Sequence, residues 1–362
     1  MTAPGERETR AKLARMRGWL ARSGAGALRL RGVDWFAWAA AGASNAVLLT
    51  AEAGVAEALV TADAAYVLTD AIEAERLRSE QVLAPWTWQV TPWARQELRE
   101  HFVRHAAAGA GVLSDRPGPL EHALPAWARD ERLVLAAPER ARYRQLGRLA
   151  AGAASATLRA ARPGWTEYEL AGAAAQALCA RGLAPALVLA AGAERLGRYR
   201  HPLPTAQPLG RRAMLVLCAR RFGLYANLTR FVSFGAGADP RQQALMALEA
   251  VGLDACEPGQ PLSTVYRALE GAYAYAGWPD AILQHHQGGI TGYLAREVLA
   301  SAHAETCLRD GMALALNPSL DGIKIEDTFL LEGGELENLT FDPDWPWALV
   351  QGRKRPLCLE KT

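Results

Sequence analysis

Residues 215–235 constrain the fold and the chemistry of this chain more than any other feature. The segment reads LVLCARRFGLYANLTRFVSFG, and no aspartate or glutamate occurs between Arg211 and Ala238. Hard divalent cations require oxygen ligands, and in proteins these are mostly carboxylates. Any site that uses this segment therefore obtains no carboxylate from it, and that absence does not depend on how the segment is aligned with another sequence.

The length and composition are those of a globular protein with two domains. A chain of 362 residues can bury two cores of ordinary size. Half of the residues are hydrophobic and 22% are charged, as in soluble proteins. The net charge of +2 gives no reason to expect a nucleic acid or an anionic membrane as a partner.

The cysteines and the N-terminal residues indicate the compartment. The five cysteines are far apart and form no CxxC pair, so we expect reduced thiols rather than a disulfide framework or a zinc knuckle. The first 24 residues contain no long apolar run, which excludes a signal peptide or a membrane span there. The sequence therefore predicts a cytoplasmic protein.

Residues 1–133 are predicted to form an α/β domain. Leu13, Met16 and Leu20 recur at helical spacing before Gly24, where a helix should end. Short runs with strand character follow at Ala27–Leu30, Ala46–Thr50, Glu57–Thr61, Tyr66–Thr69 and Gly111–Ser114. Helical stretches are predicted at Ala71–Ser79, Thr91–His105 and Leu120–Asp130.

Residues 136–350 are predicted to form a second, more helical domain, followed by a C-terminal tail over residues 351–362. Thr166 and Glu169 have the spacing of a capping box, so a helix should begin there. Another helix should start near Ser263 and end before Gly277. Pairs of helices alternate with pairs of strands along this part of the chain.

The segment 215–235 resembles a strand-turn-strand unit of the creatinase/aminopeptidase P/prolidase family. The matching residues are Gly223, Tyr225, Leu228, Thr229, Arg230 and Gly235. The resemblance extends over nearly the whole chain, including the segment VDWFAWAAAGASNAVLLT, which corresponds to a strand, a turn and a second strand. It implies an α/β fold class, with an N-terminal creatinase-like domain followed by a pita-bread domain of pseudo-two-fold α+β architecture. It also implies a homodimer.

The resemblance assigns five positions to the ligands of two divalent metal ions, which the family holds with two aspartates, one histidine and two glutamates. The aligned segments are residues 215–235, QHHQGGITGYLARE, GMALALNPSL and IKIEDT. The residues at the five positions are Val216, Asn227, Gly289, Asn317 and Glu326. One carboxylate therefore remains of the family's four.

Charge decides against a dinuclear centre. Two divalent ions carry four positive charges, and Glu326 alone leaves about three of them uncompensated. Burying one unpaired ion costs several kcal/mol even after relaxation. We therefore expect no metal cofactor at the family's site. A single relocated metal ion that uses Glu326, Asp327, His285 or His286 is the alternative.

Other polar residues of the family's pocket are present. By the resemblance, His201 and His285 stand where the family has substrate-contacting histidines, and Arg296 stands in place of a third. We predict His201, His285 and Glu326 as catalytic candidates, and Asn227, Arg296, Asn317 and Arg230 as substrate-binding residues. Glu326 needs a positive partner such as Arg230, Arg296 or Lys324. His286, next to His285 on an expected strand, should point to the opposite face.

Four functions are compatible with these residues. The first is a prolidase-like protein that has lost its dinuclear site and binds a small molecule or a peptide terminus. The second is a creatinase-like hydrolase that cleaves a C–N bond without a metal, and the third is an Xaa-Pro peptidase with a relocated metal. The fourth is a protein-interaction module, because some members of the family reuse the fold without catalysis. For none of them do we expect a nucleic acid or a membrane as a partner.

Overall fold

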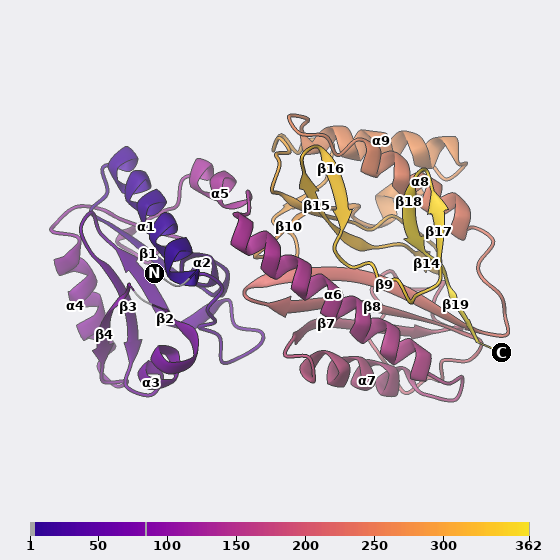
Figure 1. Cartoon of the computed structure of the whole chain (residues 1–362), viewed down its shortest axis with the longest axis horizontal. Coiled ribbons are helices and arrows are strands. Elements are labelled where there is room, and N and C mark those ends of the chain that lie inside the picture. Colours follow the sequence, from indigo (N-terminus) through magenta and orange to yellow (C-terminus); the bar gives the residue numbers. More distant parts are fainter. Residues whose placement is uncertain (1–3, 84, 362) are drawn as a thin grey trace. The chain divides into compact units, whose positions relative to one another are not determined.

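The computed structural model describes residues 4–83 and 85–361, and the chain forms two compact units (Figure 1). The first unit ends at Arg132 and the second begins at Leu133. All five cysteines are free thiols. Within the described ranges, no helix combines the length and the apolar character needed to cross a membrane.

The first unit is built on a mixed six-stranded sheet in the order β4-β3-β2-β1-β5-β6. Strands β1, β2 and β3 pair antiparallel, whereas β4, β5 and β6 each pair parallel to a neighbour. Their bounds are β1 Ala27–Gly32, β2 Ala53–Val60, β3 Ala65–Asp70, β4 Thr87–Thr91, β5 Val112–Ser114 and β6 Glu121–Ala123. The α/β character predicted for this unit is confirmed.

The elements of the first unit differ from the sequence prediction at several places, including the helix expected at Leu120–Asp130, where Glu121–Ala123 forms β6 and the helix begins only at Ala126. The helices are α1 Pro4–Ser23, α2 Val33–Ala39, α3 Ala74–Arg76 with the π-helical turn Leu77–Gln81, α4 Gln96–Ala106 and α5 Ala126–Arg132. Residues 33–39 were expected to form a strand, but their buried, alanine-containing sequence forms α2. The expected strand at 46–50 is also absent, and these residues form bends and a turn before β2.

The first half of the second unit packs two helices against a four-stranded sheet. The helices are α6 Ala137–Ala160 and α7 Glu167–Cys179, and the sheet has the order β19-β9-β8-β7. The strands are β7 Ala184–Gly192, β8 Arg212–Arg221, β9 Leu224–Phe234 and β19 Leu359–Lys361. Phe222 and Gly223 both have positive φ, which suits the tight turn between β8 and β9. The capping box of α7 is confirmed by reciprocal hydrogen bonds between Thr166 and Glu169.

The second half of this unit packs another helix pair against a five-stranded sheet in the order β11-β10-β12-β15-β16. The helices are α8 Gln242–Asp254, α9 Leu262–Tyr275 and the 3-10 helix Ala281–Gln284. The strands are β10 Gly288–Thr291, β11 Val298–Leu299, β12 Ala313–Leu316, β15 Asp327–Glu332 and β16 Glu335–Asn338. Two hairpins join them, made of β13 Ser319–Leu320 with β14 Ile323–Lys324, and of β17 Trp347–Val350 with β18 Arg353–Pro356.

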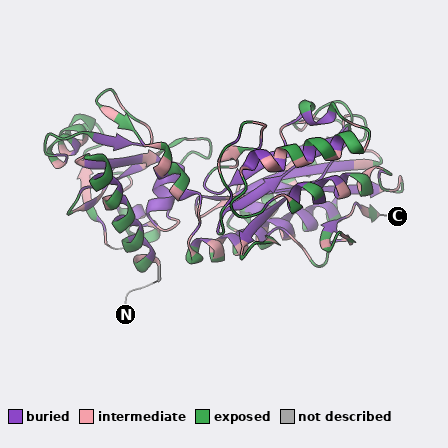
Figure 2. Ribbon diagram, turned by 90° about the horizontal axis from the view of Figure 1, so that it is seen from above, coloured by how far each residue is buried: buried purple, intermediate pink, exposed green. Residues whose placement is uncertain are grey.

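The two sheets of the second unit meet at β9 and β15. A β-bridge links Thr229 to Glu326, and the Thr229 N–H donates to the Glu326 carbonyl at 3.1 Å. Apolar side chains from both halves, such as Phe231 and Phe329, share one buried core. Figure 2 shows these strands buried and the outward faces of the helices exposed. The helix pairs lie on the outside of the unit and the strands lie within it. The junction of β9 and β15 is therefore at the centre of the unit.

The last residues of the chain, treated in the sequence as a tail, belong to this core. Strand β19 pairs parallel to β9, with Leu359 opposite Val232. Strand β18 carries Arg355, which has no exposed surface. Paired residues that lie 127 positions apart leave no local trace in the sequence, which is why the tail could not be recognised as strand.

Candidate functional site

Glu326 lies at the junction of the two sheets and is held by three donors. Arg296 Nη2 donates to Oε1 at 2.6 Å, while Lys324 Nζ at 3.0 Å and Thr229 Oγ1 at 2.9 Å both donate to Oε2. Burial opposes the ionisation of Glu326, but the charges of Lys324 and Arg296 outweigh it and lower the pKa of the carboxyl to about 2. Glu326 is therefore a permanently ionised anchor for two cations.

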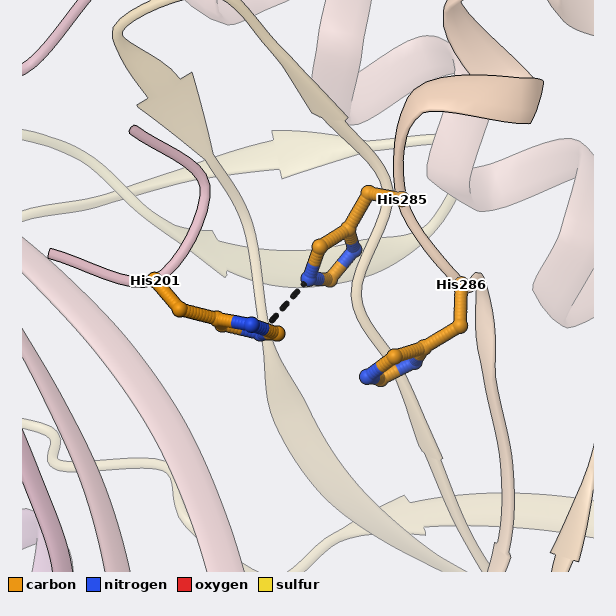
Figure 3. Close-up of side chains that lie close together, drawn as sticks. All are labelled: His201, His285 and His286. Carbon is orange, nitrogen blue, oxygen red and sulfur yellow. Dashed lines mark hydrogen bonds between the residues drawn. The ribbon is translucent and has the colours of Figure 1, made fainter. Parts of the chain in front are cut away.

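Three histidines form a cluster beside this ion group (Figure 3). His201 comes from the loop before β8, and His285 and His286 follow the 3-10 helix. His201 Nε2 and His285 Nε2 lie 3.0 Å apart, and one nitrogen from each of the three rings falls within a 4.8 Å spread. His201 is exposed and His285 is buried, so the cluster opens to solvent on one side. We call these histidines, together with Arg296, Lys324 and Glu326, the polar site.

The histidines are neutral at neutral pH. Burial lowers the pKa of all three rings, to about 3 for His285 and about 4 for His286. The positive charge of Lys324 adds to the effect for His201 and His285, and those of Arg296 and Lys324 do so for His286. The opposing charge of Glu326 is too small to reverse the shift. The field at the cluster is therefore net positive, which favours an anion there.

The prediction that His286 points away from His285 is wrong. The two rings stack with centroids 4.4 Å apart. Alternation between faces holds only inside a strand, and β10 begins at Gly288, so His286 lies in the irregular stretch before it. The backbone N–H of Gly288 donates to His286 Nδ1 at 3.2 Å and fixes the ring on the same side as His285.

Asn227 and Asn317 each present a buried oxygen without a partner. Asn227 Nδ2 donates to Thr291 Oγ1 at 3.2 Å, but the Oδ1 atoms of both asparagines accept no hydrogen bond from any described residue. A buried acceptor without a donor costs free energy. These two oxygens can therefore accept hydrogen bonds from a ligand.

The residues at the family's five metal positions do not fit two hard cations. Val216 belongs to the apolar core. Gly289 has φ of +145°, and a Cβ atom there would lie 2.1 Å from the carbonyl oxygen of Val298. The backbone thus excludes a histidine side chain at Gly289. Asn227 and Asn317 offer neutral oxygens, and the Glu326 carboxylate is already neutralised by protein cations.

Arg230, predicted to bind substrate, turns away from the polar site. Its Nη2 donates to Asp327 Oδ1 at 2.7 Å and to the Thr340 carbonyl at 2.8 Å. Asp327 also accepts from Arg355 Nη1 at 2.8 Å. Neighbouring positions on β9 face opposite sides, so the Thr229 hydroxyl reaches the Glu326 carboxylate, whereas the Arg230 guanidinium reaches only the Glu326 backbone carbonyl and joins the buried network of Asp327. Asp327 is likewise committed there and cannot serve a relocated metal.

Sequence reasoning missed two polar neighbours of the site. Thr291 binds the Asn227 amide, and Cys218 lies directly opposite Asn227 in the β8–β9 ladder. Burial raises the pKa of the Cys218 thiol to about 12, so it is not a thiolate nucleophile. The alternation of side chains along β8 is the signal that would place Cys218, but only once the register is known.

The polar site can bind an anion. Arg296 Nε is buried and donates no hydrogen bond to any described residue. Lys324 also borders a cavity of about 40 Å³ that is lined in part by Tyr199, Arg200 and Asp321. Among the residues of the polar site, Lys324 alone lines this cavity, which has room for a few water-sized groups. The site thus contains the cationic donors Arg296 and Lys324, neutral imidazole rings and amide oxygens that accept no hydrogen bond from the described residues.

Solved structures similar to this chain include a prolidase, an Xaa-Pro dipeptidase and a domain of a FACT complex subunit. The prolidase from Pyrococcus horikoshii OT3 has a TM-score of 0.77 at 18% identity, covering 91% of this chain and 98% of its own. The Xaa-Pro dipeptidase from Bacillus anthracis has a TM-score of 0.75 at 17% identity, covering 92% and 98%. The N-terminal domain of the FACT complex subunit SPT16 from Cicer arietinum has a TM-score of 0.66 at 13% identity, covering 92% and 96%.

These likenesses confirm the pita-bread fold expected from the sequence. Because the sequence identities are below one fifth, these structures show the fold alone, and the function must be argued from the residues of the site. No curated protein matches the sequence. The sequence model of metallopeptidase family M24 matches residues 141–332, more than half of the chain, and the chain therefore belongs to this family.

Proposed function

We propose that this protein is a member of the M24 family without two-metal peptidase activity, which binds the carboxylate of a small molecule or of a peptide C-terminus at the polar site. The observation that carries the proposal is the ion group of Glu326. Two protein cations, Arg296 and Lys324, lie within 3.0 Å of its only carboxylate. They supply the positive charge that a metal pair would otherwise bring to this position.

Charge supports an anionic ligand. Two cations against one carboxylate leave one positive charge, and the three neighbouring imidazoles are neutral. Arg296 Nε supplies a donor that no described residue uses. A ligand carboxylate placed there receives charge-assisted hydrogen bonds, which are about twice as strong as neutral ones.

The two unpartnered amide oxygens support a ligand that also carries N–H groups. Asn227 Oδ1 and Asn317 Oδ1 are buried acceptors, and a ligand amine or amide would satisfy them. A short peptide combines such a donor with a terminal carboxylate. The dipeptides suggested by the related Xaa-Pro dipeptidase are therefore suitable first probes.

Binding of glycyl-proline tests the proposal by titration calorimetry. We expect the free acid to bind, and we expect the affinity for glycyl-prolinamide to be at least about tenfold lower. The amide cannot form the charged hydrogen bonds that the carboxylate forms. Arg296→Gln should weaken binding of the acid by a similar factor, and Arg296→Lys should recover only part of it. Arg267→Gln, an exposed arginine on α9, is the matched control and should bind like wild type.

A hydrolysis assay tests whether the protein lacks metal-dependent peptidase activity. The same protein, incubated with Mn²⁺ or Co²⁺ and glycyl-proline, should release no free proline. Metal-dependent release would overturn the proposal, as would equal affinity for the acid and the amide.

One observation favours a second candidate, metal-independent hydrolysis. His201 Nε2 and His285 Nε2 are in hydrogen-bond contact, and the exposed His201 can exchange a proton with a bound water. Glu326 does not take part as a base, because both of its oxygens are occupied and its pKa is about 2. This candidate predicts turnover of a guanidino or amide compound that resists a chelator and is abolished by His201→Ala.

A further inference from the structure

Three imidazoles on the open side of the polar site are arranged as a metal-ligand set. They come from two segments 84 residues apart, the loop carrying His201 and the stretch carrying His285 and His286. In Figure 3 the His201 and His286 rings point toward one another beneath His285. One nitrogen from each ring falls within a 4.8 Å spread.

We propose that His201, His285 and His286 bind a single divalent transition-metal ion of the zinc class, with a fourth position open to an anion. The site shares no residue with the carboxylate positions of the family's dinuclear centre. It does not depend on the proposed function, although the two would share one bound anion.

The nitrogen positions can reach those of a single ion if the His201–His285 pair separates slightly and the more distant nitrogens of the cluster, up to 4.8 Å apart, move closer. Ligands on a tetrahedral zinc ion with metal–nitrogen bonds of about 2.0–2.1 Å are about 3.4 Å apart. His201 and His285 already approach to 3.0 Å between their Nε2 atoms. His201 is exposed and lies in a loop, so it can adjust its rotamer, whereas the buried His285 holds the fixed corner of the set.

The donor set selects the metal. Neutral imidazole nitrogens favour Zn²⁺, Ni²⁺ and Cu²⁺ over the hard ions Mg²⁺ and Ca²⁺. Neutral rings also require no loss of a proton before they bind a metal. Glu326 does not convert this group into an oxygen-rich site, because its two oxygens already accept from Arg296, Lys324 and Thr229.

The three histidines are not equivalent ligands. His286 Nδ1 accepts from the Gly288 N–H at 3.2 Å, so in the neutral ring its proton resides on Nε2. Ligation through Nε2 moves that proton to Nδ1 and breaks this hydrogen bond. His285 Nδ1 has no partner among the described residues, so a proton on that atom breaks no existing hydrogen bond. His286 should therefore be the weakest of the three ligands.

The surrounding charge predicts coupling to an anion. Lys324 and Arg296 repel a metal ion more than Glu326 attracts it, since their charges already disfavour protonated rings at the same place. An anion at the fourth position offsets this repulsion. By linkage, the anion and the metal then raise each other's affinity by the same factor.

The zinc content of the protein tests the site. Protein incubated with Zn²⁺ and desalted should retain about one ion per chain, and X-ray absorption should show imidazole nitrogens at about 2.0 Å. His201→Ala and His285→Gln should retain about one tenth of an ion or less, and His286→Ala an intermediate amount. His303→Ala, an exposed histidine outside the cluster, is the matched control and should retain one ion.

Each other outcome has a defined meaning. No zinc in the wild-type protein, or full zinc in folded His201→Ala, overturns the proposal. Because His201 is exposed, that variant should fold, and circular dichroism checks it. Two ions per chain that disappear in Asn227→Ala would instead indicate the family's dinuclear centre, and would overturn the proposed function as well. Binding of glycyl-proline by metal-free protein tests the proposed function separately.

Discussion

Replacing Arg355 with methionine is expected to lower the free energy of unfolding of the second unit by about 3–5 kcal/mol. Arg355 has no exposed surface, and its Nε and Nη2 each donate to Glu249 at 2.6 Å. Its Nη1 donates to Asp327 at 2.8 Å. Asp327 would keep Arg230 as a partner in the variant, but Glu249 would be left as a buried carboxylate without a cation.

The pH dependence of this variant follows from Glu249. Burial raises the pKa of Glu249 to about 7, although Arg355 acts to lower it, so loss of Arg355 raises it further. A carboxyl whose pKa is higher in the folded state binds more protons there than in the unfolded state. Stability of Arg355→Met should therefore fall as pH rises from about 4.5 to above 7, over the range in which the carboxyl of the unfolded state is ionised and that of the folded state is still protonated.

Urea unfolding of matched variants measures the effect. Arg353→Met, on the same strand, removes an exposed pair with Asp254 and should cost about 1 kcal/mol or less. The double variant Arg355→Met with Glu249→Met should recover much of the loss, because both charges are then replaced by apolar groups. Equal losses for Arg355→Met and Arg353→Met would contradict a role for β18 in the core.

Local chemistry explains what the sequence could predict. The capping box at Thr166, the extent of α9 and the partners Arg296 and Lys324 of Glu326 all depend on residues close together in sequence or on the aligned motifs. The β8–β9 hairpin follows from a family resemblance that includes Gly223 at its turn. The polar site lies beside that hairpin. The segments that surround the site could therefore be predicted from the sequence, although the positions of their side chains could not.

Long-range pairing explains what the sequence could not predict. The strand at 359–361 exists because β9 offers an edge, and the pairing partner is far away in the chain. His286 joins the cluster because residues 285–287 precede β10 and escape strand alternation. Arg230 leaves the site because Asp327, Thr340 and Arg355 converge on its side of β9. The contacts of residues 359–361 and of Arg230 have no local signal, and the position of His286 depends on where β10 begins.

Glu326→Gln should have opposite effects on stability and on anion binding. Glu326 is buried, and its pKa of about 2 lies well below the value of 4.5 for a free side chain. A carboxyl with a lowered pKa contributes stability that is present above about pH 4.5 and is lost as pH falls through about 2. At pH 7 the variant should therefore be about 3 kcal/mol less stable, and its difference from wild type should shrink below about pH 4.5.

The same substitution releases Arg296 and Lys324 from their only carboxylate in the polar site, so glycyl-proline should bind more tightly by about tenfold. Glu257→Gln, at an exposed glutamate after α8, is the control and should change neither quantity. If Glu326 instead bound a metal ion or acted as a base, the Glu326→Gln variant would bind glycyl-proline more weakly or lose turnover. Reduced stability together with tighter anion binding is the result that only an anchoring role for Glu326 predicts. Urea unfolding at pH 7 measures the stability, and titration calorimetry at the same pH measures the affinity.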